Sequence, residues 1–169
     1  MTSRESQIID HIPHLRRYAR ALLHDREAAD DLVQDCLARA MGRLDQWQPS
    51  GTMRSWLFTI LHNIHVNQLR KQGRAPDIRS DTDGVEQEPV AGEHDSGLSV
   101  RDMTAALGQL PEEQRSTILL IGLEGLSYAE TATVTGVPVG TVMSRLARGR
   151  ERLREIINLD AVPPLRRVR

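Results

Sequence analysis

The chain is poor in cysteine and aromatic residues, and it has no long apolar run. Cys36 is the only cysteine among 169 residues, which excludes an intramolecular disulfide and a cysteine-rich zinc site. Aromatic side chains make up only 3% of the chain. Leucine, alanine, isoleucine and valine dominate the apolar set, which favours helical cores over a sheet sandwich. No apolar run is long enough to span a bilayer, and residues 1–12 lack a signal-peptide apolar region. We therefore expect an all-α, cytoplasmic protein without membrane insertion.

Catalytic motifs are also missing. The sequence contains no phosphate-binding glycine loop, nucleophile elbow or paired-carboxylate motif. His11 and His14, like His62 and His65, are three residues apart on expected helices, but no acidic or cysteine ligand completes a metal set. We expect surface or groove-lining histidines, no metal, no cofactor and no enzymatic activity of the chain alone. Cys36 could be a redox switch, although a buried small residue is the usual outcome.

The net charge of −1 hides an uneven distribution. Residues 1–75 carry 11 basic and 8 acidic side chains, residues 76–100 carry 1 and 7, and residues 101–169 carry 10 and 8. From Arg145 onward there are 8 basic and 3 acidic residues, so this end of the chain suits a polyanion. A neutral whole predicts modest DNA affinity alone and help from a larger partner.

The acidic stretch divides the chain into two expected helical domains. Residues 76–99 are rich in Asp, Glu, Gly, Pro and Ser and lack periodicity, which predicts a flexible acidic linker. An ordered surface loop is the alternative, but the length of the stretch argues against it. The domains are then 1–75 and 100–160, and 161–169 form a basic tail. Apolar spacing predicts helices at 5–23, 27–44, 52–71, 100–108 and 111–123. Ile9 belongs to the apolar side of the first helix, and Pro13 is a point where this helix could kink or split.

Residues 127–154 have the pattern of a helix-turn-helix. Ser127 can cap the first helix, Gly136 can adopt the left-handed conformation that ends it, and Pro138 can precede the second helix. The inward stripe of the second helix is Val142, Leu146, Gly149 and Leu153. Its other side carries side chains that can bind bases or phosphates, namely Thr141, Ser144, Arg145, Arg148 and Arg152. An ordinary amphipathic helix with a solvated basic face is the alternative, but the turn chemistry favours DNA binding.

Four segments in order resemble the extracytoplasmic-function (ECF) sigma factors, the two-domain sigma factors of bacterial RNA polymerase. They are DDLVQDCLARA (30–40), MRSWLFTILHNIHVNQLRKQGR (53–74), LPEEQRSTILLIGLEGLSYAE (110–130) and GVPVGTVMSRLARGRERL (136–153). The N-terminal wording is most similar to the general-stress-response branch. The resemblance implies a sigma region 2 domain at 1–75 and a sigma region 4 domain at 100–160.

The resemblance implies roles for the first domain. The helix from Ala28 to Met41 would dock on the clamp helices of the large catalytic subunit of RNA polymerase. Its polar contacts would be Asp31, Gln34, Asp35 and Arg39. Without the resemblance, Asp30 and Asp31 would be read as solvated first-turn acids. The loop around Trp47 would catch flipped bases of the −10 element, although a core aromatic is a nearly equal alternative for Trp47. Trp56 is expected in the core. The next helix would hold the edge of the melted duplex through Asn63, Asn67, Arg70 and Lys71.

In the second domain, the helix-turn-helix from Tyr128 to Ala147 would read the −35 element in duplex DNA. Arg145 and Arg148 are the leading contacts, with Thr141 and Ser144 beside them, and Tyr128 either touches a phosphate or caps the core. Met143 departs from the family, which commonly has a basic residue there. The implied partners are core RNA polymerase, including its flap, promoter DNA and an anti-sigma factor. Two alternatives are a sigma-like decoy that sequesters an anti-sigma factor and a stand-alone helix-turn-helix regulator.

Overall fold

The computed structural model describes residues 2–73 and 99–161, which form helices and short turns with no strand. This confirms the all-α expectation. The predicted first domain contains α1 (Ser3–Leu23), α2 (Arg26–Gly42), the 3₁₀ turn η1 (Leu44–Gln46) and α3 (Met53–Lys71). The second contains α4 (Val100–Gly108), α5 (Glu112–Ile118), η2 (Leu119–Leu123), α6 (Tyr128–Thr135) and α7 (Val139–Ala161). The expected acidic linker lies outside the described residues except for Ser99, and the basic tail except for residue 161.

The helices of the first domain begin at side-chain caps and share one core. Thr2, Asp25 and Thr52 each accept a hydrogen bond from a backbone N–H of the first turn, which satisfies a group that the helix itself leaves free. In the core, the rings of Tyr18 and Phe58 meet edge to face with centroids 5.3 Å apart. This core fixes which faces of α2 and α3 point outward.

Two details of α1 differ from the sequence expectation. The helix is not split at Pro13, which lies on its exposed side. Ile9 is 48% exposed, whereas its neighbour Ile8 is 3% exposed. Adjacent helical residues lie about 100° apart around the axis, so α1 can turn only one of the two into the core.

The second domain confirms the expected helix-turn-helix geometry. The Ser127 hydroxyl accepts from the Glu130 N–H at 3.0 Å, and Gly136 has a φ of 70° with its N–H bonded to the carbonyl of Ala132. The expected helix at 111–123 widens into a π-helical turn at η2, where the Glu124 N–H reaches the carbonyl of Leu119 at 3.0 Å. No residue pattern around Leu119 predicts this π-helical turn.

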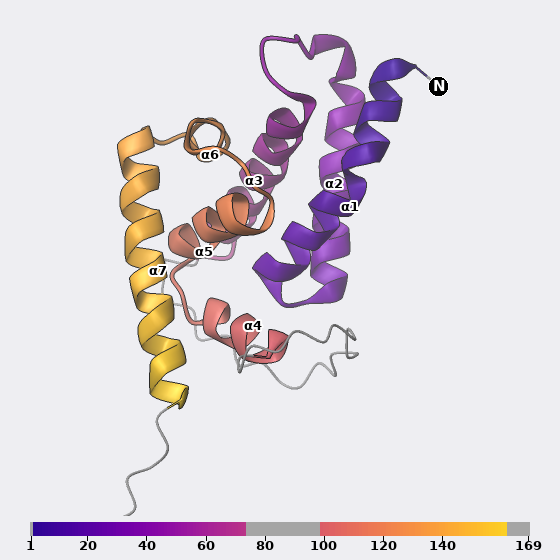
Figure 1. Ribbon diagram of the computed structural model, residues 1–169. Helices are drawn as coiled ribbons and strands as arrows, with labels where there is room; N and C mark the ends of the chain where they lie inside the picture. The colour runs from indigo at the N-terminus through magenta and orange to yellow at the C-terminus, as the bar shows by residue number, and fades with distance from the viewer. Residues whose placement is uncertain (1, 74–98, 162–169) are drawn as a thin grey trace, which may run out of the picture.

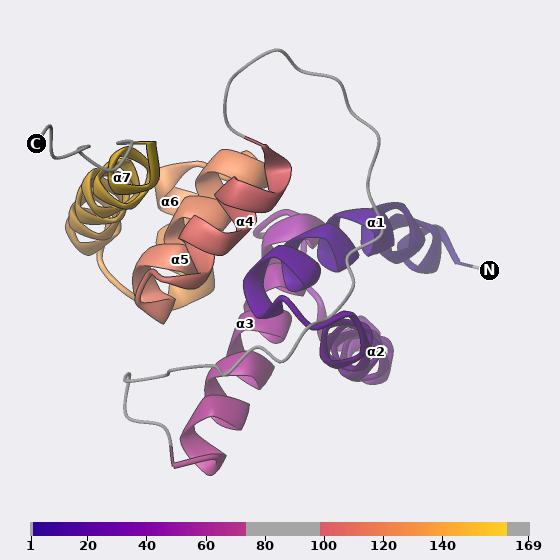
Figure 2. The same cartoon turned by 90° about the horizontal axis from the view of Figure 1, so that it is seen from below.

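The two domains pack against each other. Helix α3 lies against α6, and α1 contacts η2, while α7 forms the outer edge of the second domain (Figures 1 and 2). The sequence left this arrangement open. It brings the first helix of the helix-turn-helix beside the helix that the resemblance assigns to the −10 element.

Candidate nucleic-acid interface

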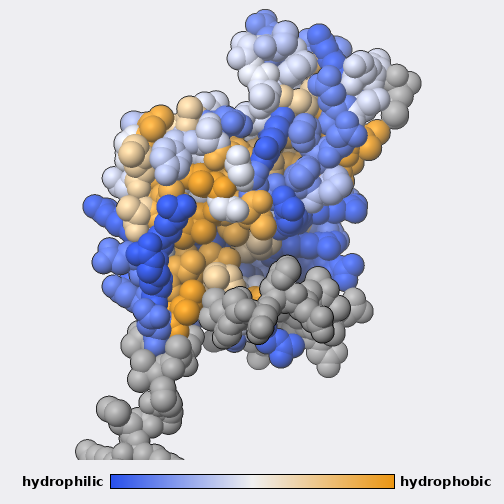
Figure 3. Space-filling model, in the orientation of Figure 1, coloured by the Kyte–Doolittle hydropathy of each residue, from blue (hydrophilic) through white to orange (hydrophobic). Residues whose placement is uncertain are grey.

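Helix α7 has a buried side toward α5 and an exposed polar side. Val142, Leu146 and Gly149 are buried and Leu153 is half-buried, which confirms the predicted inward stripe. A Cβ built at Gly149 would lie 2.8 Å from Ile118 Cδ1, so the two helices approach closely there. The hydrophilic side chains of α7 form a column along the outer edge of the molecule (Figure 3). This column is accessible to a large ligand such as duplex DNA.

The expected −35 contacts separate into two groups. Ser144 and Arg148 are exposed, as is Arg152 further along the polar side, whereas Thr141 and Arg145 are half-buried. Arg145 turns toward α5, where its Nη2 lies 3.6 Å from Glu113 Oε2 and 23% of its side chain remains exposed. Arg148 is therefore better placed than Arg145 to meet a ligand in this arrangement.

Tyr128 lies at the start of α6 and is 41% exposed, so it does not cap the domain core. Glu130, in the same first turn, accepts a hydrogen bond from the Ser55 hydroxyl of α3 at 3.2 Å. The Ser55 hydroxyl also accepts a hydrogen bond from the hydroxyl of Thr52, the residue that caps α3, at 3.0 Å. The beginning of the helix-turn-helix is thus tied to the beginning of α3.

The polar residues expected at the −10 element lie together on α3. Asn63, Asn67, Arg70 and Lys71 are all exposed. Trp47 is half-buried against the core, with the Arg4 guanidinium carbon 5.7 Å from the centroid of its ring. Its indole therefore packs partly against the core, which is in line with the alternative interpretation of Trp47 as a core aromatic. Trp56 is also only half-buried, although it packs against the core as expected.

Helix α2 presents a polar row opposite its buried side. Asp31, Gln34, Asp35 and Arg39 are exposed, and Met41 beside them is 48% exposed. Asp30 is half-buried and meets Arg20 of α1 at 3.3 Å. The four expected polymerase contacts therefore form one accessible surface, and Asp30 does not belong to it.

Buried ion pairs join the two domains. The Glu124 side chain has no exposed surface, and its carboxylate accepts from Arg17 Nε at 2.9 Å and Nη2 at 3.0 Å. His14 Nδ1 lies 3.4 Å from the same carboxylate. A carboxylate buried this completely requires such partners, because leaving water without compensation is costly. Glu124 therefore acts as a polar link between the second domain and α1.

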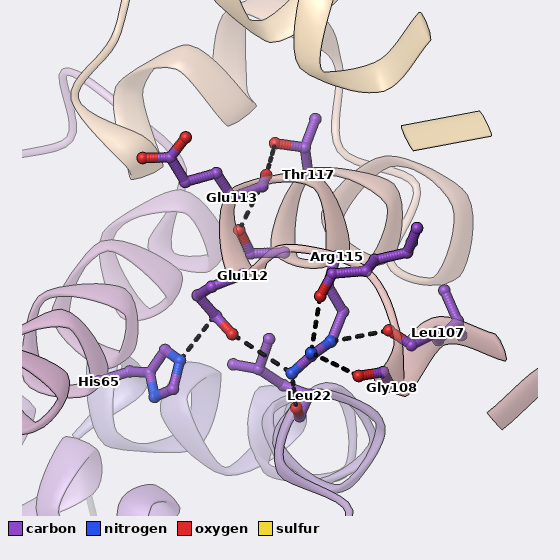
Figure 4. A network of polar contacts seen from close by, with 10 residues as sticks. Leu22, His65, Leu107, Gly108, Glu112, Glu113, Arg115 and Thr117 are labelled. Carbon is purple, nitrogen blue, oxygen red and sulfur yellow. Dashed lines mark hydrogen bonds and ion pairs between the residues drawn. The ribbon is translucent and has the colours of Figure 1, made fainter. Parts of the chain in front are cut away.

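A second polar cluster lies where α3 meets α5 (Figure 4). His65 Nε2 is 2.7 Å from Glu112 Oε1, and His65 is only 2% exposed. Arg115 donates to the carbonyl of Leu22 at the end of α1 and to three carbonyls around the end of α4, those of Leu107, Gly108 and Leu110. Arg115 thereby joins the first domain to the turn between α4 and α5.

Four of the histidines in the described residues have neighbours across this domain interface, namely His14, His24, His62 and His65. Burial, followed by the neighbouring charge of His65, lowers the pKa of His62 to about 4. Burial and the charge of Arg115 also lower the pKa of His24. The expectation of surface histidines is wrong for His65, because the second domain covers α3. Within the described residues, no group of three His, Cys, Asp or Glu side chains could hold a metal ion.

Cys36 is fully buried between α2 and α3. Its Sγ lies 3.5 Å from the carbonyl of Leu57, and burial raises the pKa of the thiol to about 12. A thiolate is therefore almost absent near neutral pH, which favours the packing role over a redox switch.

Comparison with known proteins identifies the family of the chain. A family model for the sigma2 domain of PhyR matches residues 8–62, and a model for sigma-70 region 4 matches residues 101–153. The ECF RNA polymerase sigma factor EcfG of Rhodopseudomonas palustris is 36% identical over 94% of this chain and 87% of its own length. The chain belongs to the ECF RNA polymerase sigma factor family.

Solved structures of related proteins have the same fold. One of them is the sigma factor RpoE from Bartonella quintana, solved in complex with the anti-sigma factor NepR. RpoE is 37% identical in sequence to this ECF sigma factor. The match covers 92% of this chain and 97% of that one, with a TM-score of 0.73. The anti-anti-sigma factor PhyR, solved with NepR from the same organism, is 17% identical over 92% of this chain and 51% of that one. Its TM-score of 0.62 shows a shared fold.

The sequence of this ECF sigma factor did not reveal the interface residues Arg17, Glu112 and Glu124. Glu112 and Glu124 look like ordinary acids at helix ends, and Arg17 is one of several basic residues on α1. The one signal of this interface in the sequence was the placement of two histidine pairs, His11 with His14 and His62 with His65, on helices that also carry apolar stripes. Among residues 2–73 and 99–161, no helix is sufficiently long and apolar to span a membrane.

Proposed function

We propose that this ECF sigma factor binds core RNA polymerase and directs promoter-specific initiation by recognising −10 and −35 elements. The observation that carries the proposal is the exposed polar face of α7 on a helix-turn-helix with complete turn geometry. Ser144 and Arg148 on this face have the chemistry to contact base edges and phosphates of a −35 duplex. The match of residues 101–153 to sigma-70 region 4 supports the same role.

The first domain would supply polymerase docking. Asp31, Gln34, Asp35 and Arg39 line the exposed side of α2, beside the exposed Met41. Charged groups around an apolar side chain suit a basic, amphipathic partner helix, such as those of the polymerase clamp. The flap of the polymerase would contact the second domain.

Recognition of the −10 element would use α3. The exposed amides of Asn63 and Asn67 can bond to unpaired base edges, and Arg70 and Lys71 can bind the phosphates beside them. Trp47 would stack on a flipped base only if its contacts with Arg4 and the core loosen. We therefore assign the stronger part of this interaction to α3.

An anti-sigma factor would regulate this activity. The sigma factor RpoE from Bartonella quintana, which shares 37% of its residues with this chain, is bound by one in its complex with NepR. The domain interface combines packing of α3 against α6 with polar contacts, and it offers such a partner two surfaces whose relative placement the partner can stabilise. Promoter access would then depend on release of the partner.

Run-off transcription with purified core polymerase tests the proposal. Wild-type protein should start transcription at a cognate promoter, and Asp35→Arg should abolish core binding while the helical circular dichroism spectrum is retained. Asp10→Arg, an equally exposed acid-to-base change on α1, is the matched control. Normal assembly of the Asp35 variant refutes the docking assignment. No transcription from any promoter by folded wild-type protein refutes the function.

A sigma-like decoy for an anti-sigma factor is the second candidate. Its supporting observation is the match of residues 8–62 to the sigma2 domain of PhyR, a protein described as an anti-anti-sigma factor. A decoy would bind an anti-sigma factor but would fail to capture core polymerase in a pull-down. A stand-alone regulator, by contrast, would bind a specific duplex tightly without polymerase.

A further inference from the structure

The start of α7 carries two large apolar side chains that the core does not use. Val139 is 41% exposed and Met143 is 51% exposed, whereas Val142 and Leu146 on the same helix are 0% and 4% exposed. Residues four apart lie one above the other on a helix, so Val139 and Met143 form a continuous apolar strip. Ala147, one turn further on, is also exposed and extends the strip.

The charged residues around this strip indicate what covers it. Ser144 and Arg148 lie beside it on the exposed side, and further along the helix three arginines, Arg150, Arg152 and Arg154, outnumber the exposed acids Glu151 and Glu155. An apolar protein partner placed here would have to desolvate these guanidinium groups without compensation, which is costly. A polyanion compensates them, so the ligand that fits both the strip and its surroundings is DNA.

The position of Arg145 strengthens the case for the apolar strip. Its guanidinium lies 3.6 Å from Glu113 and is turned toward α5, away from Met143. In the first turn and a half of α7, the large or polar side chains on the exposed face are those of Val139, Met143 and Ser144. Thymine is the base that offers an apolar group, its 5-methyl, in the major groove.

We propose that Met143, supported by Val139, recognises the 5-methyl group of a thymine in the −35 duplex. The proposal rests on the −35 function proposed above and names the base feature that this helix reads. The flexible, polarisable thioether of methionine adapts its shape to a methyl group, whereas lysine or arginine at this position would favour guanine or a phosphate. Met143 is therefore a specificity-determining residue.

The experiment removes the methyl group and nothing else. Holoenzyme reconstituted from core polymerase and the full chain first selects a duplex from a random −35 library. Each thymine in that element is then replaced by deoxyuridine, and dissociation constants are measured by fluorescence anisotropy. We expect one replacement to weaken wild-type binding about fourfold, the effect of losing one buried methyl-sized group. Met143→Ala should bind the thymine and deoxyuridine duplexes equally.

Ile9→Ala is the matched control, because Ile9 is a similarly exposed aliphatic residue on α1. This variant should retain the full deoxyuridine effect. The proposal is overturned if no deoxyuridine replacement affects wild-type binding, or if Met143→Ala shows the same loss as wild type. It is also overturned if Met143→Ala weakens core binding in the absence of DNA, which would indicate a protein contact. Failure of the holoenzyme to select any duplex would instead overturn the −35 function itself.

Discussion

The domain interface and the outer face of α7 both contain arginines, but they place them in different surroundings. Arg17 donates two hydrogen bonds to the fully buried carboxylate of Glu124, and Arg115 binds carbonyls from both domains. Arg148 and Arg152 are exposed to solvent. The same residue type therefore links domains in one region and is open to a ligand in the other. Arginine content alone does not distinguish the two uses, because burial of the partner decides which applies.

Arg17→Ala is the largest expected break in this comparison. It leaves the Glu124 carboxylate at the interface without its main donor. This should destabilise the closed arrangement, in which the two domains pack against each other, by about 3 kcal/mol. This is the low end for a buried pair, because Arg17 is itself half exposed. Hydrogen exchange of η2 and α6 should accelerate, whereas the neighbouring exposed substitution Arg16→Ala should leave it unchanged. Equal protection in both variants would mean that other contacts hold the domains together.

Arg148→Ala should affect the outer face instead. We expect −35 binding by the holoenzyme to weaken by about 1–3 kcal/mol, with no change in hydrogen exchange at the interface. Arg145→Ala should have a smaller effect, since its guanidinium already pairs with Glu113. Arg101→Ala, at an exposed position of α4, is the control for loss of one positive charge. A larger loss from Arg145→Ala would show that the Glu113 pair opens in the DNA complex.

Acidification from pH 7.5 to 5.5 should reduce the stability of the packed domain interface by about 1 kcal/mol. The pKa of His62 is lowered to about 4 in the closed arrangement, where His65, Glu112 and Arg145 face it. Below pH 6.5 an open form takes up a proton that the closed form excludes, at up to about 1.4 kcal/mol per pH unit. The contribution of neutral His62 to the stability of the interface is therefore complete above pH 6.5 and is lost as the pH falls toward 4. The lowered pKa of His24 acts in the same direction.

Hydrogen exchange at pH 7.5 and 5.5 measures this effect, and His62→Gln should reduce the difference between the two conditions. A pH response of unchanged size in that variant would assign the proton uptake to another group.

The smallest expected effect concerns Cys36. The pKa of about 12 predicts negligible alkylation by iodoacetamide at neutral pH in folded protein. The Arg17→Ala variant should be equally unreactive, because Cys36 lies inside the first domain and away from the interface. Mass spectrometry of the alkylated protein provides the measurement. Rapid labelling of the variant would mean that the first domain itself loosens, so that opening is not confined to the interface.

The helices and the helix-turn-helix were predictable because their signals are local. Ser127 caps α6 through a group three residues away, and Gly136 ends it through its own φ angle. The outward placement of Ser144 and Arg148 follows from helical periodicity once Val142 and Leu146 are assigned to the core. The exposed state of Ile9 was not predictable, because two adjacent isoleucines compete for one buried position and packing chooses between them.

By itself, the sequence determined the all-α class, the caps and ends of most helices, the inward stripe of α7 and the resemblance to ECF sigma factors. Only the tertiary structure decided that Glu124 meets Arg17, 107 residues away, that His65 meets Glu112, and that Arg145 turns to Glu113 and leaves Arg148 and Met143 on the open face. The reason is physical. A cap or an apolar stripe acts within a few residues, whereas the partner of a buried charge depends on how complete domains pack.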